Sequence, residues 1–123
     1  MAVADLDARF AGLPTTEYAG GLTVIEAESH KSRRRGLSKL DGLPVTHALH
    51  IPQTPSVHTF GMRFALDLIW LDKRGAAVRI DHDVSARRMR FCARARSVIE
   101  TVAGQADSFL AAGVGAPETA GAN

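Results

Sequence analysis

The segment FALDLIWL, residues 64–71, is the most apolar run of the sequence, and one carboxylate, Asp67, lies in its middle. Successive side chains of a β-strand point to opposite faces. In this segment both faces are largely apolar: Phe64, Leu66, Leu68 and Trp70 lie on one face, and Ala65, Asp67, Ile69 and Leu71 on the other. An apolar strand of this length with two apolar faces is typical of the middle of a sheet. The segment therefore predicts a central strand.

The segments around this run predict further strands. Residues 72–75, DKRG, form a short polar tetrad that ends in glycine, and they predict a hairpin between the central strand and residues 76–80. β-Branched composition or alternation predicts the remaining strands at residues 22–27, 45–51 and 97–102. Pro52 and Pro55 interrupt hydrogen-bond ladders, so the chain must turn before Ser56.

Helix signals are few and short. Ser32 is a candidate N-cap for a two-turn helix over residues 32–40. A second short helix is expected over residues 103–112, and Gly113 would end it. Residues 3–13 carry apolar side chains at helical spacing, which predicts a short helix or an arm that lies against the domain.

These elements predict an α+β domain that is mainly β: a compact, barrel-like, largely antiparallel sheet with two or three short helices. The chain of 123 residues, 46% of them apolar, is long enough for one hydrophobic core and too short for two independent cores. The expected organisation is an N-terminal arm or short helix over residues 1–19, a single β-rich domain over residues 20–113 and a disordered tail over residues 114–123.

Composition favours a cytoplasmic protein with no membrane role. No run reaches the roughly 18 apolar residues of a spanning helix. The N-terminal sequence MAVADLDARF carries acidic residues where a signal peptide has a basic start and an unbroken apolar stretch. Cys92 is the only cysteine, so no internal disulfide can form, which fits a reducing compartment.

Residues 56–72, SVHTFGMRFALDLIWLD, resemble the defining motif of the uncharacterised bacterial and archaeal family known as domain of unknown function 192. The resemblance rests on His58, Thr59, Phe60, Gly61, Met62, Arg63, Phe64 and Asp67, followed by Asp72 and Gly75. It extends upstream to Arg35-Gly36-Leu37 and downstream through residues 95–100 and Ala103-Gly104, so that it covers residues 20–113. The resemblance implies a compact single domain built on a barrel-like sheet with a few short helices.

Two positions depart from the family pattern. Thr54 stands where members often carry a cysteine, so no thiol or metal role transfers to that position. Ala65 stands where many members carry a proline. Cys92 lies near a position where relatives often have another cysteine, and it is left without that partner.

Asp67 is the most informative polar residue, because a carboxylate with apolar neighbours needs a hydrogen-bond partner or a positive charge if it is buried. If residues 61–64 reverse the chain in a tight turn, antiparallel pairing places His58 opposite Asp67. Such a pair could perform acid-base chemistry near neutral pH, or it could be a structural strut. No hydroxyl lies in a recognisable nucleophile setting; the candidates are Ser56, Thr59 and Ser97.

The residues between His58 and Asp67 also suggest an anion-binding site. Gly61 has no side chain, so a ligand can approach the backbone, and Arg63 beside that bend suits a carboxylate or a phosphate. The alternative is that Arg63 neutralises Asp67 or Asp72. The predicted ligand-binding residues are His58, Thr59, Gly61, Met62, Arg63 and Asp67.

Positive charge is segregated into two blocks although the net charge is only +2. Residues 31–39 and residues 87–96 each carry five bases and no acid. Such blocks can attract an acidic protein or phosphates, or they can be solvated faces of loops and strands. Neither block matches a recognised nucleic-acid-binding module, which argues against sequence-specific recognition. The predicted partner-binding residues are Arg33, Arg34, Arg35, Arg87, Arg88 and Arg90.

No metal and no cofactor are expected. The candidate metal ligands His47, His50, His58 and His82 lack the close spacing of zinc signatures. His47 and His50 would also point to opposite faces of one strand.

The leading hypothesis is a non-enzymatic binding or accessory domain in which residues 58–67 shape a small polar site for an anionic ligand. One alternative is a small hydrolase or other acid-base enzyme that uses His58 and Asp67, with Arg63 stabilising negative charge as it develops. Another is an adaptor that binds an acidic partner or nucleic acid through its arginines. The sequence leaves open the ligand, the partner and the choice between monomer and homodimer.

Overall fold

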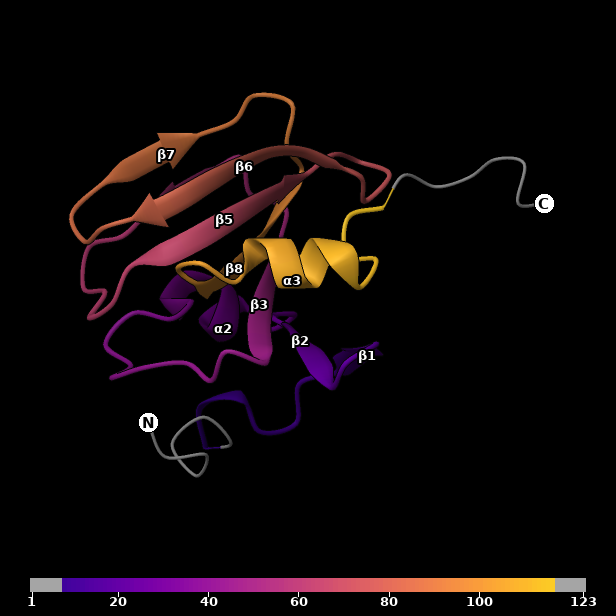
Figure 1. The fold of residues 1–123 in the computed structure, drawn as a ribbon. Coiled ribbons are helices and arrows are strands. Elements are labelled where there is room, and N and C mark those ends of the chain that lie inside the picture. The colour runs from indigo at the N-terminus through magenta and orange to yellow at the C-terminus, as the bar shows by residue number, and fades with distance from the viewer. Residues whose placement is uncertain (1–7, 117–123) are drawn as a thin grey trace.

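The predicted central strand, β5 (Leu66–Leu71), is buried along its whole length. In the computed structural model, which describes residues 8–116, it pairs antiparallel with β8 (Ser97–Val102) and with β6 (Ala77–Val84). The sheet has six strands in the order β1-β2-β3-β8-β5-β6. Its other strands are β1 (Thr15–Tyr18), β2 (Leu22–Glu26) and β3 (His47–Pro52). Figure 1 shows how the sheet twists from β6 down to β1.

The sheet is mixed and open. β2 and β3 run parallel, and every other neighbouring pair in the sheet is antiparallel. The parallel pair needs a crossover, which the chain makes through α2 (His30–Arg35) and the loop after it. The prediction of a mainly β domain with short helices is confirmed. The expectation of a barrel-like sheet was too strong, because β1 and β6 remain as edges.

Each face of the sheet packs against its own layer. On one face lie α2, its following loop and a separate two-stranded ribbon formed by β4 (Ser56–His58) and β7 (Met89–Phe91). On the other face lies α3 (Ala106–Ala111), which is seen across the sheet in Figure 1. We call these the α2 face and the α3 face. Both faces of β5 are therefore covered, as its two apolar faces require.

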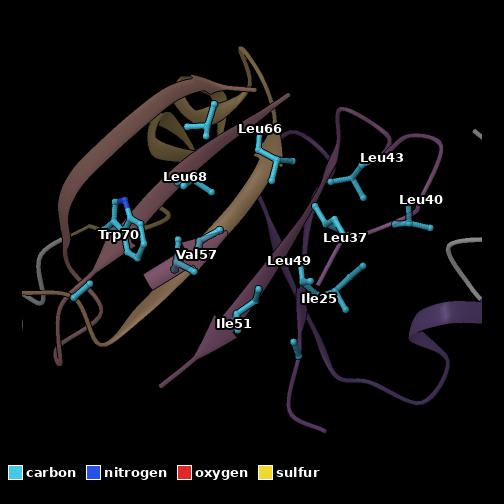
Figure 2. Packing of buried hydrophobic residues seen from close by; sticks show 14 of the residues in the cluster. Ile25, Leu37, Leu40, Leu43, Leu49, Ile51, Val57, Leu66, Leu68 and Trp70 are labelled. Atoms are coloured by element: carbon cyan, nitrogen blue, oxygen red, sulfur yellow. The ribbon is translucent and has the colours of Figure 1, made fainter. Parts of the chain in front are cut away.

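The loop after α2 supplies much of the core of the α2 face. Leu37, Leu40 and Leu43 are buried there with Ile25 and Leu49 of the neighbouring strands β2 and β3. Figure 2 shows the three loop leucines gathered beside these strand residues. A leucine side chain gains roughly 1.5–3 kcal/mol from full burial, so these contacts hold the irregular loop on the sheet.

Several predicted boundaries were wrong. α2 ends at Arg35 rather than residue 40, and its N-cap is Ser29 rather than Ser32. The Ser29 hydroxyl accepts the N–H of Ser32 at 3.0 Å, which satisfies a free donor of the first turn. Gly36 then ends the helix, with φ 51°. α3 is likewise shorter than the predicted 103–112.

The two ends of the chain also differ from the prediction. Of the predicted arm, residues 8–10 are helical and Thr15–Tyr18 forms an edge strand, which the sequence analysis missed together with β4 and β7. Of the predicted tail, Val114 is buried and the Gly115 carbonyl accepts the N–H of Ala77 at 2.8 Å. The rest of that tail, residues 117–123, and residues 1–7 of the arm lie outside the described residues. Within the described chain, no helix is long and apolar enough to cross a membrane.

Candidate functional site

Thr59 fastens the loop that follows β4 to the loop between β6 and β7. Its side chain is almost fully buried, and its hydroxyl donates to the Ser85 carbonyl at 2.7 Å and accepts from the Arg88 N–H at 2.8 Å. Its backbone N–H donates to the Arg88 carbonyl at 2.8 Å. Both hydrogen-bonding functions of the hydroxyl are thus used within the protein. Thr59 therefore has a structural role: its hydrogen bonds hold the two loops together.

Gly61 brings the same loop against the segment that follows α2. Its φ of 84° favours glycine, and a Cβ atom there would lie 2.5 Å from the Ser38 Oγ. The Gly61 carbonyl accepts the N–H of Lys39 at 2.8 Å. No larger residue fits this close approach unless the Ser38 side chain moves. Gly61 therefore joins the two walls of the site.

A cavity of about 100 Å³ opens between these walls. One wall is formed by residues 33–38 at the end of α2, and the other by residues from Thr54 to Met62. Ile51 of β3 and Glu100 of β8 contribute from the sheet below. Three of the apolar lining residues, Leu37, Ile51 and Val57, are visible in Figure 2.

Glu100 places a buried carboxyl in this cavity. The residue is only 5% exposed, and its Oε1 atom has no hydrogen-bond partner within the described part of the chain. A Cβ atom on Gly36 would lie 3.3 Å from Oε1, closer than an ordinary van der Waals contact, so glycine allows the end of α2 to pack against this carboxyl. Burial raises the pKa of Glu100 to about 7, because the charged form loses its hydration. A buried polar group without a partner requires an explanation.

Arginines border the cavity. Arg33 is half-buried and donates to the side-chain oxygen of Gln53 at 2.8 Å, whereas Arg34 and Arg35 are exposed. Arg9 reaches the same region and donates to the Ser38 carbonyl at 2.6 Å. The pKa of Arg9 is lowered, first by burial and then by the positive charges of Arg35 and Arg63. Positive charge is therefore concentrated around the mouth of the cavity.

His58 lines the cavity from β4, with its ring 5.7 Å from that of Phe60. It does not lie opposite Asp67: β4 pairs with β7, and His58 is aligned with Met89. The predicted hairpin between residues 58 and 67 is wrong because the chain leaves β4 for a loop and returns to a different sheet. His58 belongs to the cavity, and its exposed ring is available to a ligand.

Asp67 lies on the other face of the sheet. Glu100 is aligned with Leu68, the neighbour of Asp67 in β5, so alternation sends the two carboxyls to opposite faces. The Asp67 Oδ1 accepts the N–H of Asp83 at 2.9 Å, and its Oδ2 accepts those of Gly104 and Ala106, each at 3.0 Å. The expectation that Asp67 needs partners is confirmed. Those partners are backbone amides, so the predicted His58–Asp67 pair does not exist.

The remaining predicted residues are divided between the cavity and the surface. Met62 lines the cavity. Arg63 forms an exposed ion pair with Asp41 rather than with either predicted aspartate, Asp67 or Asp72. Arg33, Arg34 and Arg35, predicted as partner-binding, border the cavity, whereas Arg87, Arg88 and Arg90 lie on the β6–β7 loop and on β7.

Sequence reasoning missed Glu100, although the signal was present. Glu100 lies inside the apolar strand at residues 97–102, as Asp67 lies inside the central strand. The criterion applied to Asp67, a carboxylate among apolar neighbours, identifies both residues. The criterion does not predict which of the two carboxyls accepts hydrogen bonds from backbone N–H groups.

A second polar cluster crosses three adjacent strands on the α3 face. The His50 Nδ1 lies 2.7 Å from the Glu26 Oε1, and the His50 Nε2 lies 2.8 Å from the Ser97 Oγ. β2, β3 and β8 supply the three residues in that order, and the pairing register aligns Glu26 with His50. Ser97 is 8% exposed. We call this cluster the Ser97–His50–Glu26 chain.

No group of three or more His, Cys, Asp or Glu side chains in the described residues 8–116 is arranged to hold a metal ion. The four histidines considered as metal ligands lie apart: His58 lines the cavity, His50 belongs to the Ser97–His50–Glu26 chain, and His82 lies 3.7 Å from the Asp67 Oδ2. His47 bonds the Thr46 hydroxyl at 3.0 Å.

Two solved structures share this fold. One is a candidate transcription regulator from Sinorhizobium meliloti, with 20% identity, a TM-score of 0.63 and coverage of 82% of this chain and 86% of that chain. The other is a protein of unknown function from Novosphingobium aromaticivorans, with 14% identity, a TM-score of 0.61 and coverage of 82% and 89%. At such low identity both comparisons show the fold alone.

The comparison with curated proteins found no match. The model of the DUF192 family, described as "Uncharacterized ACR", matches residues 15–114, which include every strand of the sheet and all the residues that line the cavity. The chain therefore belongs to the DUF192 family.

Proposed function

We propose that this protein is a small-molecule-binding domain whose site is the cavity between α2 and the loop after β4. The observation that carries the proposal is the combination of a buried, unpartnered Glu100 oxygen inside the cavity and three arginines at its mouth. The chemistry of the mouth favours an anionic ligand group, because guanidinium groups bind carboxylates and phosphates through paired hydrogen bonds.

The volume of the cavity limits what it can accept. About 100 Å³ corresponds to roughly three water molecules at about 30 Å³ each. The cavity thus accommodates the end group of a small molecule, with the rest of the ligand lying at the arginine-bordered mouth. A large cofactor buried in this cavity does not fit the proposal.

The experiment is an NMR titration of the ¹⁵N-labelled protein with inorganic phosphate and with acetate. We expect the amide signals of Gly36, Ser38 and His58 to shift together and to saturate. Arg34→Gln and Arg35→Gln should each weaken the response several-fold, since each removes one positive charge from the mouth.

Arg94→Gln is the matched control. Arg94 is also exposed, but it does not line this cavity. Equal weakening by all three substitutions would indicate a general effect of net charge and would count against a site in the cavity. The absence of any saturable shift at the three amides would overturn the proposal.

A second candidate function is hydrolysis of an ester or a related acyl compound at the Ser97–His50–Glu26 chain. The supporting observation is the hydrogen-bond order itself, with distances of 2.8 Å and 2.7 Å. In such a reaction the Ser97 Oγ would attack the acyl carbon and give its proton to the His50 Nε2, while Glu26 holds the Nδ1–H. His50 would then protonate the leaving alcohol, and water would release the acid from Ser97.

Covalent labelling distinguishes this candidate from a structural chain of hydrogen bonds. A fluorophosphonate probe should phosphonylate Ser97 in the native protein, as detected by peptide mass spectrometry. The label should be absent from Ser97→Ala and strongly reduced in His50→Gln. An unlabelled Ser97 under conditions that fully label a known serine hydrolase would leave the chain as a strut between three strands.

A further inference from the structure

Resting on the proposed function, we propose that the ligand of the cavity is a short zwitterion, with an anionic group on the arginines and an ammonium group that donates to Glu100. The proposal names the chemistry of the end that enters the cavity. A ligand with only an anionic group would pair with the arginines at the mouth, but it would leave the buried carboxyl of Glu100 without a hydrogen-bond donor. Aminoalkyl acids and aminoalkyl phosphates belong to the class that supplies both groups.

The first argument is the position of the unpartnered oxygen. The Glu100 Oε1 is inaccessible to solvent and lacks a donor among the described residues. The carboxyl that carries this oxygen belongs to a residue that lines the cavity, so a cationic group in the cavity would lie beside this carboxyl and compensate its charge. Asp67 provides the contrast within the same sheet, since three backbone N–H groups satisfy its two oxygens.

The second argument is the absence of a side chain at Gly36. A Cβ atom at this position would lie 3.3 Å from the Glu100 Oε1, closer than an ordinary van der Waals contact, and 3.6 Å from the Ile51 Cδ1. Any larger residue would therefore press on the Glu100 carboxyl, which lines the same cavity. Gly36 keeps the part of the cavity wall beside Glu100 free of a side chain.

The third argument is electrostatic. Burial raises the pKa of Glu100. None of the ion pairs between described residues includes Glu100, although three arginines border the same cavity. A ligand ammonium would supply the missing positive charge, and it would favour the ionised form of Glu100.

Three probes of equal length test the proposal: taurine, 2-hydroxyethanesulfonate and 1-propanesulfonate. All three carry a sulfonate that stays anionic, and they differ only in an ammonium, a hydroxyl or a methyl group at the other end. NMR titration gives the dissociation constant of each probe from the Gly36, Ser38 and His58 amides. At about pH 8 we expect taurine to bind at least tenfold more tightly than 1-propanesulfonate, with 2-hydroxyethanesulfonate between them.

Two further measurements attribute this preference to Glu100. In Glu100→Gln, which removes the charge and keeps the shape, the ratio between taurine and 1-propanesulfonate should fall close to one. In the unsubstituted protein the ratio should shrink about tenfold between about pH 8 and about pH 6, because Glu100 becomes protonated across this interval. The pH series needs no variant, so the test stands even if Glu100→Gln fails to fold.

The outcomes separate the two proposals. Equal affinities for the three probes, insensitive to pH, would overturn the zwitterion inference and leave the anion site in place. A taurine preference that persists in folded Glu100→Gln would also overturn it. If phosphate, acetate and all three sulfonates leave the amides unshifted at tens of millimolar, the site itself is refuted and this inference with it.

Discussion

The carboxyl oxygen Oε1 of Glu100 faces the missing side chain of Gly36, since a Cβ atom built on that glycine would stand 3.3 Å away. Glu100 lies in β8, the last strand along the described chain, whereas Gly36 ends α2 far earlier in the sequence. Both residues line a cavity that also has three arginines around its mouth. Substitutions at these two positions and elsewhere in the sheet should therefore affect ligand binding and stability differently.

Gly36→Ala should abolish binding of taurine in the cavity. The added methyl group occupies the space beside Glu100, and the backbone at φ 51° and ψ −132° is unfavourable for alanine, so we also expect a loss of at least about 1 kcal/mol of unfolding free energy. Gly75→Ala is the control, because Gly75 has φ 81° and nothing within 4 Å of a Cβ atom. Urea denaturation should show destabilisation of both variants, and NMR titration should show lost binding only for Gly36→Ala. Normal binding by folded Gly36→Ala would contradict the site.

Glu100 should make the native state less stable as the pH rises. Its folded-state pKa of about 7 lies above the ordinary value of 4.5, so the native protein binds more protons than the unfolded chain between these values. The free energy of unfolding contributed by this group therefore falls as the pH rises from about 4.5 to about 7, by up to about 3 kcal/mol. Glu100→Gln removes this dependence. Urea denaturation at about pH 5 and about pH 8 should show the variant gaining stability relative to the native protein at the higher pH, and a constant difference would refute the assignment.

Asp67→Asn should destabilise the fold without changing anion binding. The substitution removes the charge from hydrogen bonds to three backbone amides and turns an amide N–H₂ toward at least one of them, which costs about 2–4 kcal/mol. Asp83→Asn serves as the control because the Asp83 side chain is exposed and its backbone N–H, the donor to Asp67, is retained. Chemical denaturation measures the stability of both variants. A folded Asp67→Asn that loses phosphate binding would show that this residue reaches the site after all.

Arg63→Gln should alter neither stability nor binding by much. The ion pair between Arg63 and Asp41 is exposed on both sides, and such pairs contribute roughly 0–1 kcal/mol. Its removal should leave the dissociation constant of inorganic phosphate within about twofold, in contrast to Arg34→Gln at the mouth of the cavity. Comparison of the two variants in one NMR titration series checks the difference. If Arg63→Gln weakened phosphate binding more than Arg34→Gln, the anion would bind near Arg63, among the residues that the family motif first suggested.

The alternation of apolar side chains along the sequence correctly predicted the longer buried strands. The predicted strand over residues 64–71 has apolar side chains on both faces, and its residues from Leu66 to Leu71 form β5, with both faces covered. Residues 97–102 were predicted and found as a strand with the same bounds. The helix over residues 32–40 was misplaced because two serines, Ser29 and Ser32, offer equivalent caps, and only the geometry of the chain selects Ser29. The short strands β4 and β7 pair with each other and have too few residues to show a period.

The sequence by itself determined that this chain belongs to the DUF192 family and is mainly β, with a buried central strand, because side-chain alternation and family motifs are properties of neighbouring residues. It also determined that a carboxylate inside an apolar strand must find partners. Only the tertiary structure decided which partners those are. Asp67 accepts hydrogen bonds from backbone N–H groups on the α3 face, whereas Glu100 lies against Gly36 on the α2 face. This outcome depends on strand register and on the crossover between β2 and β3, which bring together residues far apart in the chain.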